Sequence, residues 1–202
     1  MQVVDQIHGA FVHTRRVRWL AQQLAPLMPR DGAVLDVGCG DGALASAIAM
    51  QRPDISVTGL ETLPRDPCLI TVEPFDGEII PRQDNAADTV LFVDVLHHTH
   101  DPVRLLSEAL RVARRSVVIK DHNRNGLFAE ATLRFMDRVG NARHGVALPY
   151  NYWSREQWVS AFEQLGCETL TYQPRPKLYA WPASAIFGRS LHFIAELAVP
   201  AA

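Results

Sequence analysis

Seven residues between a predicted strand and a predicted helix have the composition of a ligand-binding loop. The segment Asp36-Val37-Gly38-Cys39-Gly40-Asp41-Gly42 joins the apolar, strand-like run at 33–38 to the helical run at 42–51. Glycines at every second position let the backbone turn sharply and come close to a bound molecule. The helix that follows offers free backbone N–H groups to a carboxylate or a phosphate. The pattern predicts a ligand site, although glycine spacing of this kind also occurs in loops that bind nothing.

Two acidic residues lie where they can reach such a ligand. Asp36 precedes the first glycine by two residues and can meet a cationic group, and Glu61 ends the next predicted strand. A carboxylate at a strand end can accept both hydroxyls of a ribose. The GxGxG spacing differs from the GxGxxG fingerprint of dinucleotide sites. Each acid alone is also explained as a turn cap or a solvated strand end, so the prediction rests on their combination at successive strand ends.

The elements that must position these residues alternate along the chain. Apolar and β-branched runs predict strands, and Asp101-Pro102 and the Ser154/Gln157 capping box mark two helix starts. Strands alternating with helices imply a parallel sheet with helices on both faces. The predicted strands are 33–38, 55–61, 68–73, 88–94, 116–121, 167–173 and 190–198, and the predicted helices include 5–28, 42–51, 102–113, 125–139 and 155–166.

These motifs together resemble the class I S-adenosylmethionine (SAM)-dependent methyltransferases, and among them the type 11 small-molecule enzymes. VLDVGCGDG matches the first motif of that family residue for residue and TGLE matches the second, while FDGEIIP and TVLFVDVLHH are similar to the third and fourth. The resemblance spans about residues 11–123, with a looser match beyond. It implies one three-layer, Rossmann-like α/β domain over 1–202, with strand order 3-2-1-4-5-7-6 and strand 7 antiparallel. It also implies an N-terminal helical segment at 1–30 and a helix-and-loop insertion at 122–153 near the acceptor site.

The resemblance assigns cofactor contacts position by position. Backbone atoms would line the methionine portion of SAM, Asp36 would orient its ammonium group through water, and Glu61 would hold the ribose. An acid and a glycine after the third strand would meet the adenine, and the backbone after the fourth would close the site under the sulfonium. The residues are Asp36, Gly38, Cys39, Gly40, Glu61, Asp76, Gly77, Val93 and Asp94.

A general base is needed only if the acceptor must lose a proton, and histidine suits that role near neutral pH. We name His98, His122 and Tyr150 as candidate catalytic residues; His97 and His144 lie in the same segments. For His97 and His98 the alternative is that one packs against a helix and the other is solvated. Asp94, Asp121 and His122 could converge on a divalent cation, but hard cations prefer an all-oxygen shell, so we expect no metal at that set.

Composition and length limit the other functions. The chain has 202 residues, 48% hydrophobic residues and a net charge of −2, which is a globular composition without an electrostatic reason to expect nucleic acid. With neither a secretory signal pattern nor a spanning apolar run, we expect a cytoplasmic protein, a monomer or homodimer. Aromatic-rich segments at 140–153 and 174–190 could roof and rim an acceptor pocket, touch a membrane surface, or form a sheet-edge or dimer contact.

The sequence therefore predicts a SAM-dependent methyltransferase for a small, apolar or aromatic acceptor. Two alternatives stay open: a non-catalytic SAM-binding protein and an NAD(P)-dependent oxidoreductase. The second alternative requires a third glycine at a position where this chain has Ala43.

Overall fold

The computed structural model describes residues 14–141 and 149–200, and its centre is a seven-stranded sheet. The strand order is β3-β2-β1-β4-β5-β7-β6, with β1 to β5 parallel and β7 antiparallel to both of its neighbours. This order and the antiparallel β7 confirm the prediction. The strands are β1 (Ala33–Val37), β2 (Ser56–Glu61), β3 (Val72–Pro74), β4 (Ala87–Val93), β5 (Ala113–His122), β6 (Glu168–Pro174) and β7 (His192–Ala198).

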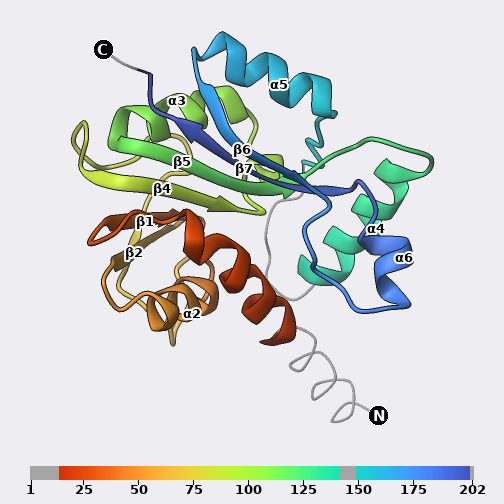
Figure 1. Ribbon diagram of the computed structural model, residues 1–202, viewed down its shortest axis with the longest axis horizontal. Coiled ribbons are helices and arrows are strands. Elements are labelled where there is room, and N and C mark those ends of the chain that lie inside the picture. Colours follow the sequence, from red (N-terminus) through yellow and green to blue (C-terminus); the bar gives the residue numbers. More distant parts are fainter. Residues whose placement is uncertain (1–13, 142–148, 201–202) are drawn as a thin grey trace.

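Helices cover both faces of the sheet, and two further helices lie past the ends of its strands (Figure 1). The helix at 14–24 and α2 lie on one face, whereas α3 and α5 lie on the other. The pair α4 and α6 lies beyond the carboxyl ends of the parallel strands, where it can help to enclose a ligand. The bounds are η1 (Ala25–Leu27), α2 (Ala43–Gln51), η2 (Leu96–His98), α3 (Pro102–Val112), α4 (Ala129–Asn141), α5 (Arg155–Gln164) and α6 (Ala183–Phe187).

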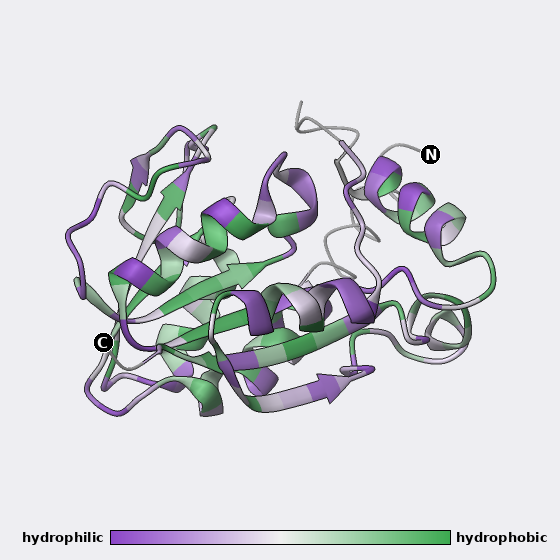
Figure 2. Ribbon diagram, turned by 90° about the horizontal axis from the view of Figure 1, so that it is seen from above, coloured by the Kyte–Doolittle hydropathy of each residue, from purple (hydrophilic) through white to green (hydrophobic). Residues whose placement is uncertain are grey.

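The core has one apolar layer on each face of the sheet. Successive side chains of a strand point to opposite faces, so Leu91 joins the layer under the first helix and α2, and its neighbours Val90 and Phe92 join the layer under α3 and α5. Strands buried on both faces read as continuous apolar runs, and the central strands are mostly hydrophobic in Figure 2. This sandwich holds the carboxyl ends of β1, β2, β4 and β5 rigidly beside one another.

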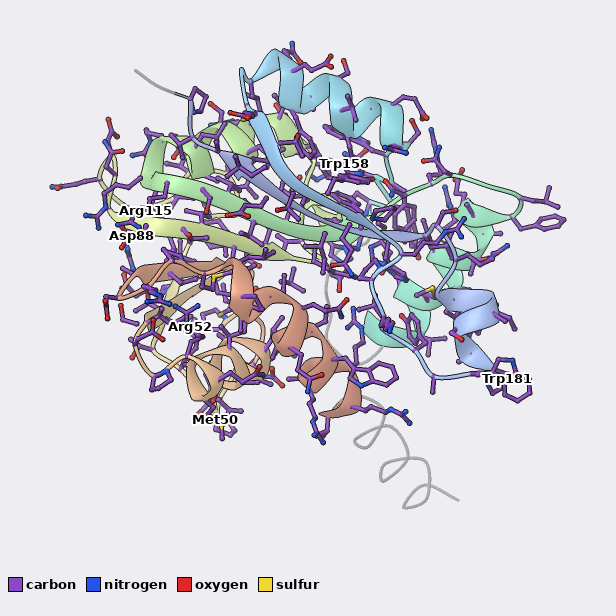
Figure 3. The ribbon with its side chains drawn as sticks, in the orientation of Figure 1. Met50, Arg52, Asp88, Arg115, Trp158 and Trp181 are labelled. Carbon is purple, nitrogen blue, oxygen red and sulfur yellow. The ribbon has the colours of Figure 1, made fainter. Side chains whose placement is uncertain are left out.

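The predicted helix starts are confirmed. The Asp101 side chain accepts from the Arg104 N–H at 3.0 Å, and Ser154 and Gln157 form the reciprocal capping box. Helix α5 then carries Trp158 onto the sheet (Figure 3), where its Nε1 donates to the His122 carbonyl oxygen at 3.0 Å. The Trp158 contact thereby fixes the end of β5, close to the predicted site.

Two elements, β3 and α4, differ most from their predicted bounds. Strand β3 spans only Val72–Pro74, because residues 68–70 pack on the glycine loop instead, with the Leu69 N–H donating to the Asp41 carbonyl oxygen at 3.0 Å. Helix α4 begins at Ala129 rather than at 125, because Gly126 and Phe128 have φ values of +106° and +58° that a helix excludes. Of the helix expected at 5–28, residues 5–13 lie outside the described part.

No helix in the described ranges combines the length and the apolar character needed to cross a bilayer.

Candidate active site

One large cavity opens at the carboxyl ends of the parallel strands. Its volume is about 1180 Å³, and its walls come from the loops after β1, β2 and β4, from the first helix, and from α4 and α6. Ligands of open α/β sheets bind at this edge, outside the point where the strand order reverses. That reversal lies between β1 and β4 here, because the chain runs outward from β1 to β3 and then returns to β4.

The glycine loop forms one wall of the cavity in a backbone conformation that other residues avoid. Gly38, Gly40 and Gly42 have φ values of +75°, +61° and +72°. A Cβ on Gly38 would lie 2.5 Å from Val95 Cγ2, so only glycine fits at this position. A Cβ on Gly40 would meet nothing but the Arg65 side chain, at 3.7 Å or more. The loop is therefore tightly packed against Val95 at Gly38 and open towards the cavity at Gly40.

Two carboxyl groups are close to this loop. Glu61 accepts from the Gly40 N–H at 2.7 Å and from the Thr62 N–H at 2.8 Å, so it both braces the loop and lines the cavity. Asp36 is 3% exposed, and burial, followed by repulsion from Glu61, raises its pKa to about 7. A cation entering the cavity would relieve that repulsion, which makes this end attractive to an ammonium group.

Asp76 lies at the opposite rim of the same wall. Its Oδ1 accepts from the backbone N–H groups of Glu78 and Ile79, both at 2.8 Å, and these bonds lower its pKa. Asp76 therefore caps the turn that follows it. Asp76 and Gly77 nevertheless both line the cavity, so capping and ligand contact are compatible at this position.

Asp94 follows β4, and its carboxylate lies between two cationic side chains. The Lys120 ammonium on β5 and the Arg16 guanidinium on the first helix both donate to it. Burial alone would raise the pKa of Asp94, but the charges of Lys120 and Arg16 hold it well below its ordinary value. Both cations occupy the carboxylate, so Asp94 has little capacity left to bind a metal with Asp121 and His122.

Three histidines gather at the end of the cavity beyond Asp94. His97 is buried, with Nδ1 2.6 Å from Asp121 Oδ1 and Nε2 3.4 Å from Asp137 Oδ2. Burial opposes a charge on this ring, but the two carboxylates outweigh burial and raise the pKa of His97 to about 10. The His98 ring lies beside it, with ring centroids 4.0 Å apart and the ring planes tilted by 42°. Burial together with the charge on His97 lowers the pKa of His98 to about 4.

His98 and His122 both line the cavity, whereas His97 lies behind them. Burial and the charges of His97 and Lys120 lower the pKa of His122. Both cavity histidines are thus neutral at pH 7. His98 Nδ1 is buried and has no hydrogen-bond partner among the described residues, so its lone pair or its proton is available to a ligand.

Comparison with known proteins decides the family. Residues 10–172, most of the chain, match the family model described as a methyltransferase domain. The chain belongs to this methyltransferase family. A curated relative, the ubiquinone biosynthesis O-methyltransferase of Thiobacillus denitrificans, is 27% identical over 190 residues that cover 83% of this chain and 79% of the relative.

Solved structures share the fold of this methyltransferase. A Haloferax volcanii methyltransferase in complex with the Trm112 activator superposes with a TM-score of 0.68 at 16% identity, covering 91% of this chain and 90% of that one. A SAM-dependent methyltransferase from Thermotoga maritima gives a TM-score of 0.64 at 17% identity, covering 98% and 96%. The family and these neighbours imply SAM as the methyl donor.

The glycine-loop end of the methyltransferase cavity suits that donor. Gly40 leaves the loop open where a Cβ would otherwise project, Asp36 offers a carboxyl group beside the loop, and Glu61 and Asp76 also line the cavity. All nine residues assigned to the cofactor from the sequence line this one cavity. The fit is chemical as well as spatial, because SAM carries an ammonium group, ribose hydroxyls and an adenine amine.

Tyr150, the third catalytic candidate, is not among the described residues that line the cavity. Its ring packs on Tyr152 in a small separate cluster, with the Arg134 guanidinium 4.9 Å from the ring centroid. His144 falls outside the described residues. Sequence reasoning missed Phe135, Met136, Asp137 and Val139, which line the cavity from α4. Their helical spacing was visible, but nothing in that spacing said which face α4 would turn to the cavity.

Proposed function

We propose that this methyltransferase transfers the methyl group of SAM to a small acceptor that is apolar or aromatic. The observation that carries the proposal is the contrast between the two ends of the cavity. One end has the glycine loop and the acids, and the other has apolar side chains of α4 and α6 around the cavity histidines.

The apolar end is built from residues that remain accessible. Phe135 and Val139 of α4 are 57% and 63% exposed although they line the cavity, and Phe135 stacks on Phe187 of α6 with ring centroids 6.4 Å apart. Large accessible apolar side chains beside a cavity favour an apolar ligand. A ligand covering them would also exclude water from the reacting groups.

Bound SAM supplies an electrophilic methyl group on a sulfonium. The chain contributes positioning: the loop after β1 and the backbone at Val93 and Asp94 border the donor, and α4 and α6 border the acceptor. Holding the two in near-attack geometry supplies much of the acceleration. The Thiobacillus denitrificans relative is named as an O-methyltransferase, which favours oxygen as the accepting atom in this chain.

An acceptor hydroxyl needs a group to receive its proton, and we assign that role to His98. Its low pKa keeps the ring neutral above about pH 4, and the ring lines the cavity. His122 is a second neutral imidazole on the same wall, but its Nδ1 lies 3.4 Å from the Asp121 carboxylate and is less free. Tyr150 is a weaker candidate because it is not among the described residues that line the cavity.

The test is methyl transfer itself. Protein and SAM are incubated with a panel of phenols and apolar alcohols, and S-adenosylhomocysteine is measured by mass spectrometry. His98→Asn should lower turnover of a hydroxyl acceptor by about 100-fold or more while the Kd for SAM is unchanged. Unchanged turnover would exclude His98 as the base. Tight SAM binding without product formation across the panel would instead favour the non-catalytic alternative.

A further inference from the structure

Three groups of histidine and acidic side chains in the described residues bring possible ligand atoms within 4.8 Å of one another. In two groups these atoms already have partners. Asp94 is held by Lys120 and Arg16, and Asp121 accepts from the backbone N–H groups of Leu96 and His122 as well as pairing with His97.

The third group, His97, His98 and Asp137, is different. The ring nitrogens His97 Nε2 and His98 Nδ1 are both buried, and neither has a hydrogen-bond partner in the described part of the chain. Buried polar atoms almost always have a partner. In the described residues His97 Nε2 has the Asp137 carboxylate at 3.4 Å, which is long for a hydrogen bond, and His98 Nδ1 has no hydrogen-bond partner, so the group points to a missing ligand. Asp137 is 7% exposed and lines the cavity with His98.

The spacing suits a tetrahedral cation. Ligands about 2.0–2.1 Å from zinc stand roughly 3.3 Å apart from each other in that geometry. His97 Nε2 and Asp137 Oδ2 are 3.4 Å apart, and all three ligand atoms lie within 4.8 Å. A movement of the His98 ring that brings Nδ1 to the same spacing would complete a three-ligand site.

The surroundings of the group also match a metal site. His97 Nδ1 lies 2.6 Å from Asp121 Oδ1, and a histidine that binds a metal commonly donates its other ring N–H to a carboxylate. The Tyr152 hydroxyl donates to Asp137 and holds that carboxylate in place. Asp121 and Asp137 put two negative charges around the His97 ring, and that arrangement favours a cation between His97 Nε2 and Asp137.

We propose that His97 Nε2, His98 Nδ1 and the Asp137 carboxylate form a binding site for Zn²⁺ at the acceptor end of the cavity. Two imidazoles and one carboxylate favour zinc over the oxygen-preferring cations Mg²⁺ and Ca²⁺. The fourth position faces the cavity, because His98 and Asp137 both line it. The expectation of no metal drawn from the sequence considered Asp94, Asp121 and His122, and did not consider Asp137 at all.

The part that zinc plays in catalysis rests on the proposed function. An acceptor oxygen in the open position would be polarised and oriented by the cation. His98 would then act as a zinc ligand, and the acceptor oxygen would contact the metal rather than the ring. Loss of His98 would lower turnover whether His98 acts as a general base or as a zinc ligand, so a measurement of activity alone does not distinguish these two roles.

Zinc binding is therefore measured directly. Protein treated with EDTA and dialysed is titrated with Zn²⁺ in a calorimeter, without SAM or acceptor. We expect one zinc per chain in the wild type, and a Kd at least about 10- to 100-fold weaker in His98→Asn and in Asp137→Asn. His100→Asn and Glu130→Gln are the matched controls, since neither residue belongs to the group, and they should bind zinc like the wild type. Circular dichroism checks that each variant is folded.

A second readout uses Co²⁺, whose visible absorption is strong in four-coordinate sites. The wild type should give that absorption, and His98→Asn should lose it. If the wild type binds no zinc, or if His98→Asn and Asp137→Asn bind as tightly as the controls, the zinc site is excluded while methyl transfer can still be measured. If zinc binds as expected but no acceptor in the panel is methylated, the zinc site stands and the proposed function fails.

Discussion

The environment of the Asp36 carboxyl group disfavours its ionised form. Burial and Glu61 raise its folded-state pKa from 3.8 to about 7. A raised pKa stabilises the folded state most below the unfolded pKa, and this contribution is lost as pH rises through about 7. We predict that Asp36→Asn increases the free energy of unfolding relative to wild type more at pH 8 than at pH 5, by roughly 1.4 kcal/mol per pKa unit.

Urea unfolding of the SAM-free wild type and Asp36→Asn at both pH values measures this difference. The comparison between variants removes the contribution of other titrating groups that the substitution leaves unchanged. An equal difference at pH 5 and pH 8 would mean that Asp36 ionises like an exposed carboxyl group and that the cavity wall is better hydrated than its burial indicates.

Glu61 accepts a hydrogen bond from the glycine loop, and the resemblance also assigns it to the ribose. Replacing it with alanine removes both the brace on the Gly40 N–H and the acceptor for the ligand. We predict that Glu61→Ala weakens SAM binding by about 1–3 kcal/mol, the cost of losing a partly buried charge-assisted hydrogen bond. Calorimetric Kd values for wild type and Glu61→Ala check this, with Glu73→Ala, an acid on neighbouring β3, as the control. An unchanged Kd would mean that Glu61 supports the glycine loop but does not bind the ribose.

Single residues also show where sequence reasoning stops. Gly38 and Asp36 could be named from the sequence, because Asp36 lies near the end of an apolar strand and Gly38 directly follows β1. Lys120 was the more difficult case: it lies within an apolar strand, and the sequence alone does not reveal that Asp94, 26 positions earlier in the chain, pairs with it and also with Arg16. A buried lysine in the run SVVIKD is still a usable signal, since an ammonium in a core requires a partner.

At the scale of elements, the strands and helices with strong local signals were predicted best. Capping residues fixed the starts of α3 and α5, whose boundaries depend on neighbouring backbone groups. Strand β3 and helix α4 were misplaced because distant contacts and left-handed residues set their limits. The direction in which α4 points its apolar residues depends on packing against α6, which no local pattern encodes.

Helix α4 gives a prediction about the acceptor. Phe135 of α4 lines the cavity, whereas Trp181, just before α6, is 83% exposed, points away from the molecule in Figure 3 and is not a lining residue. We predict that Phe135→Ala raises KM for an apolar acceptor by about 10-fold or more, since burying an aromatic side chain against ligand contributes about 1.5–3 kcal/mol. The Kd for SAM should not change.

Trp181→Ala is the matched aromatic control and should leave both constants unaltered. Steady-state kinetics with the best acceptor of the panel measure both variants. If Trp181→Ala raises KM and Phe135→Ala does not, the acceptor binds along the outer surface of α6 instead of inside the cavity.

For the whole molecule, the order of the sheet was predictable from the family resemblance, which the motifs at successive strand ends carried. The sequence placed an insertion at 122–153 near the acceptor site and offered 174–190 as a possible rim, and Tyr179 and Phe187 of that second segment do line the cavity. What the sequence did not contain was which residues of α4 and of the first helix would line the cavity. The ligand site therefore belongs to the folded chain as a unit, and a ligand bound there should stabilise the entire domain.

This stabilisation gives a test that needs no acceptor. A ligand that binds only the folded state adds about 2.7 kcal/mol of stability at 100 times its Kd, which for a chain of this length raises Tm by roughly 5–10 °C. We predict such a shift with SAM and with S-adenosylhomocysteine, measured by scanning calorimetry, and none with NADH. The GxGxG loop, with its third glycine one residue earlier than in dinucleotide sites, is the physical reason for that selectivity. A shift with NADH and none with SAM would place the chain among oxidoreductases in function despite its methyltransferase family, because a fold by itself does not fix the ligand.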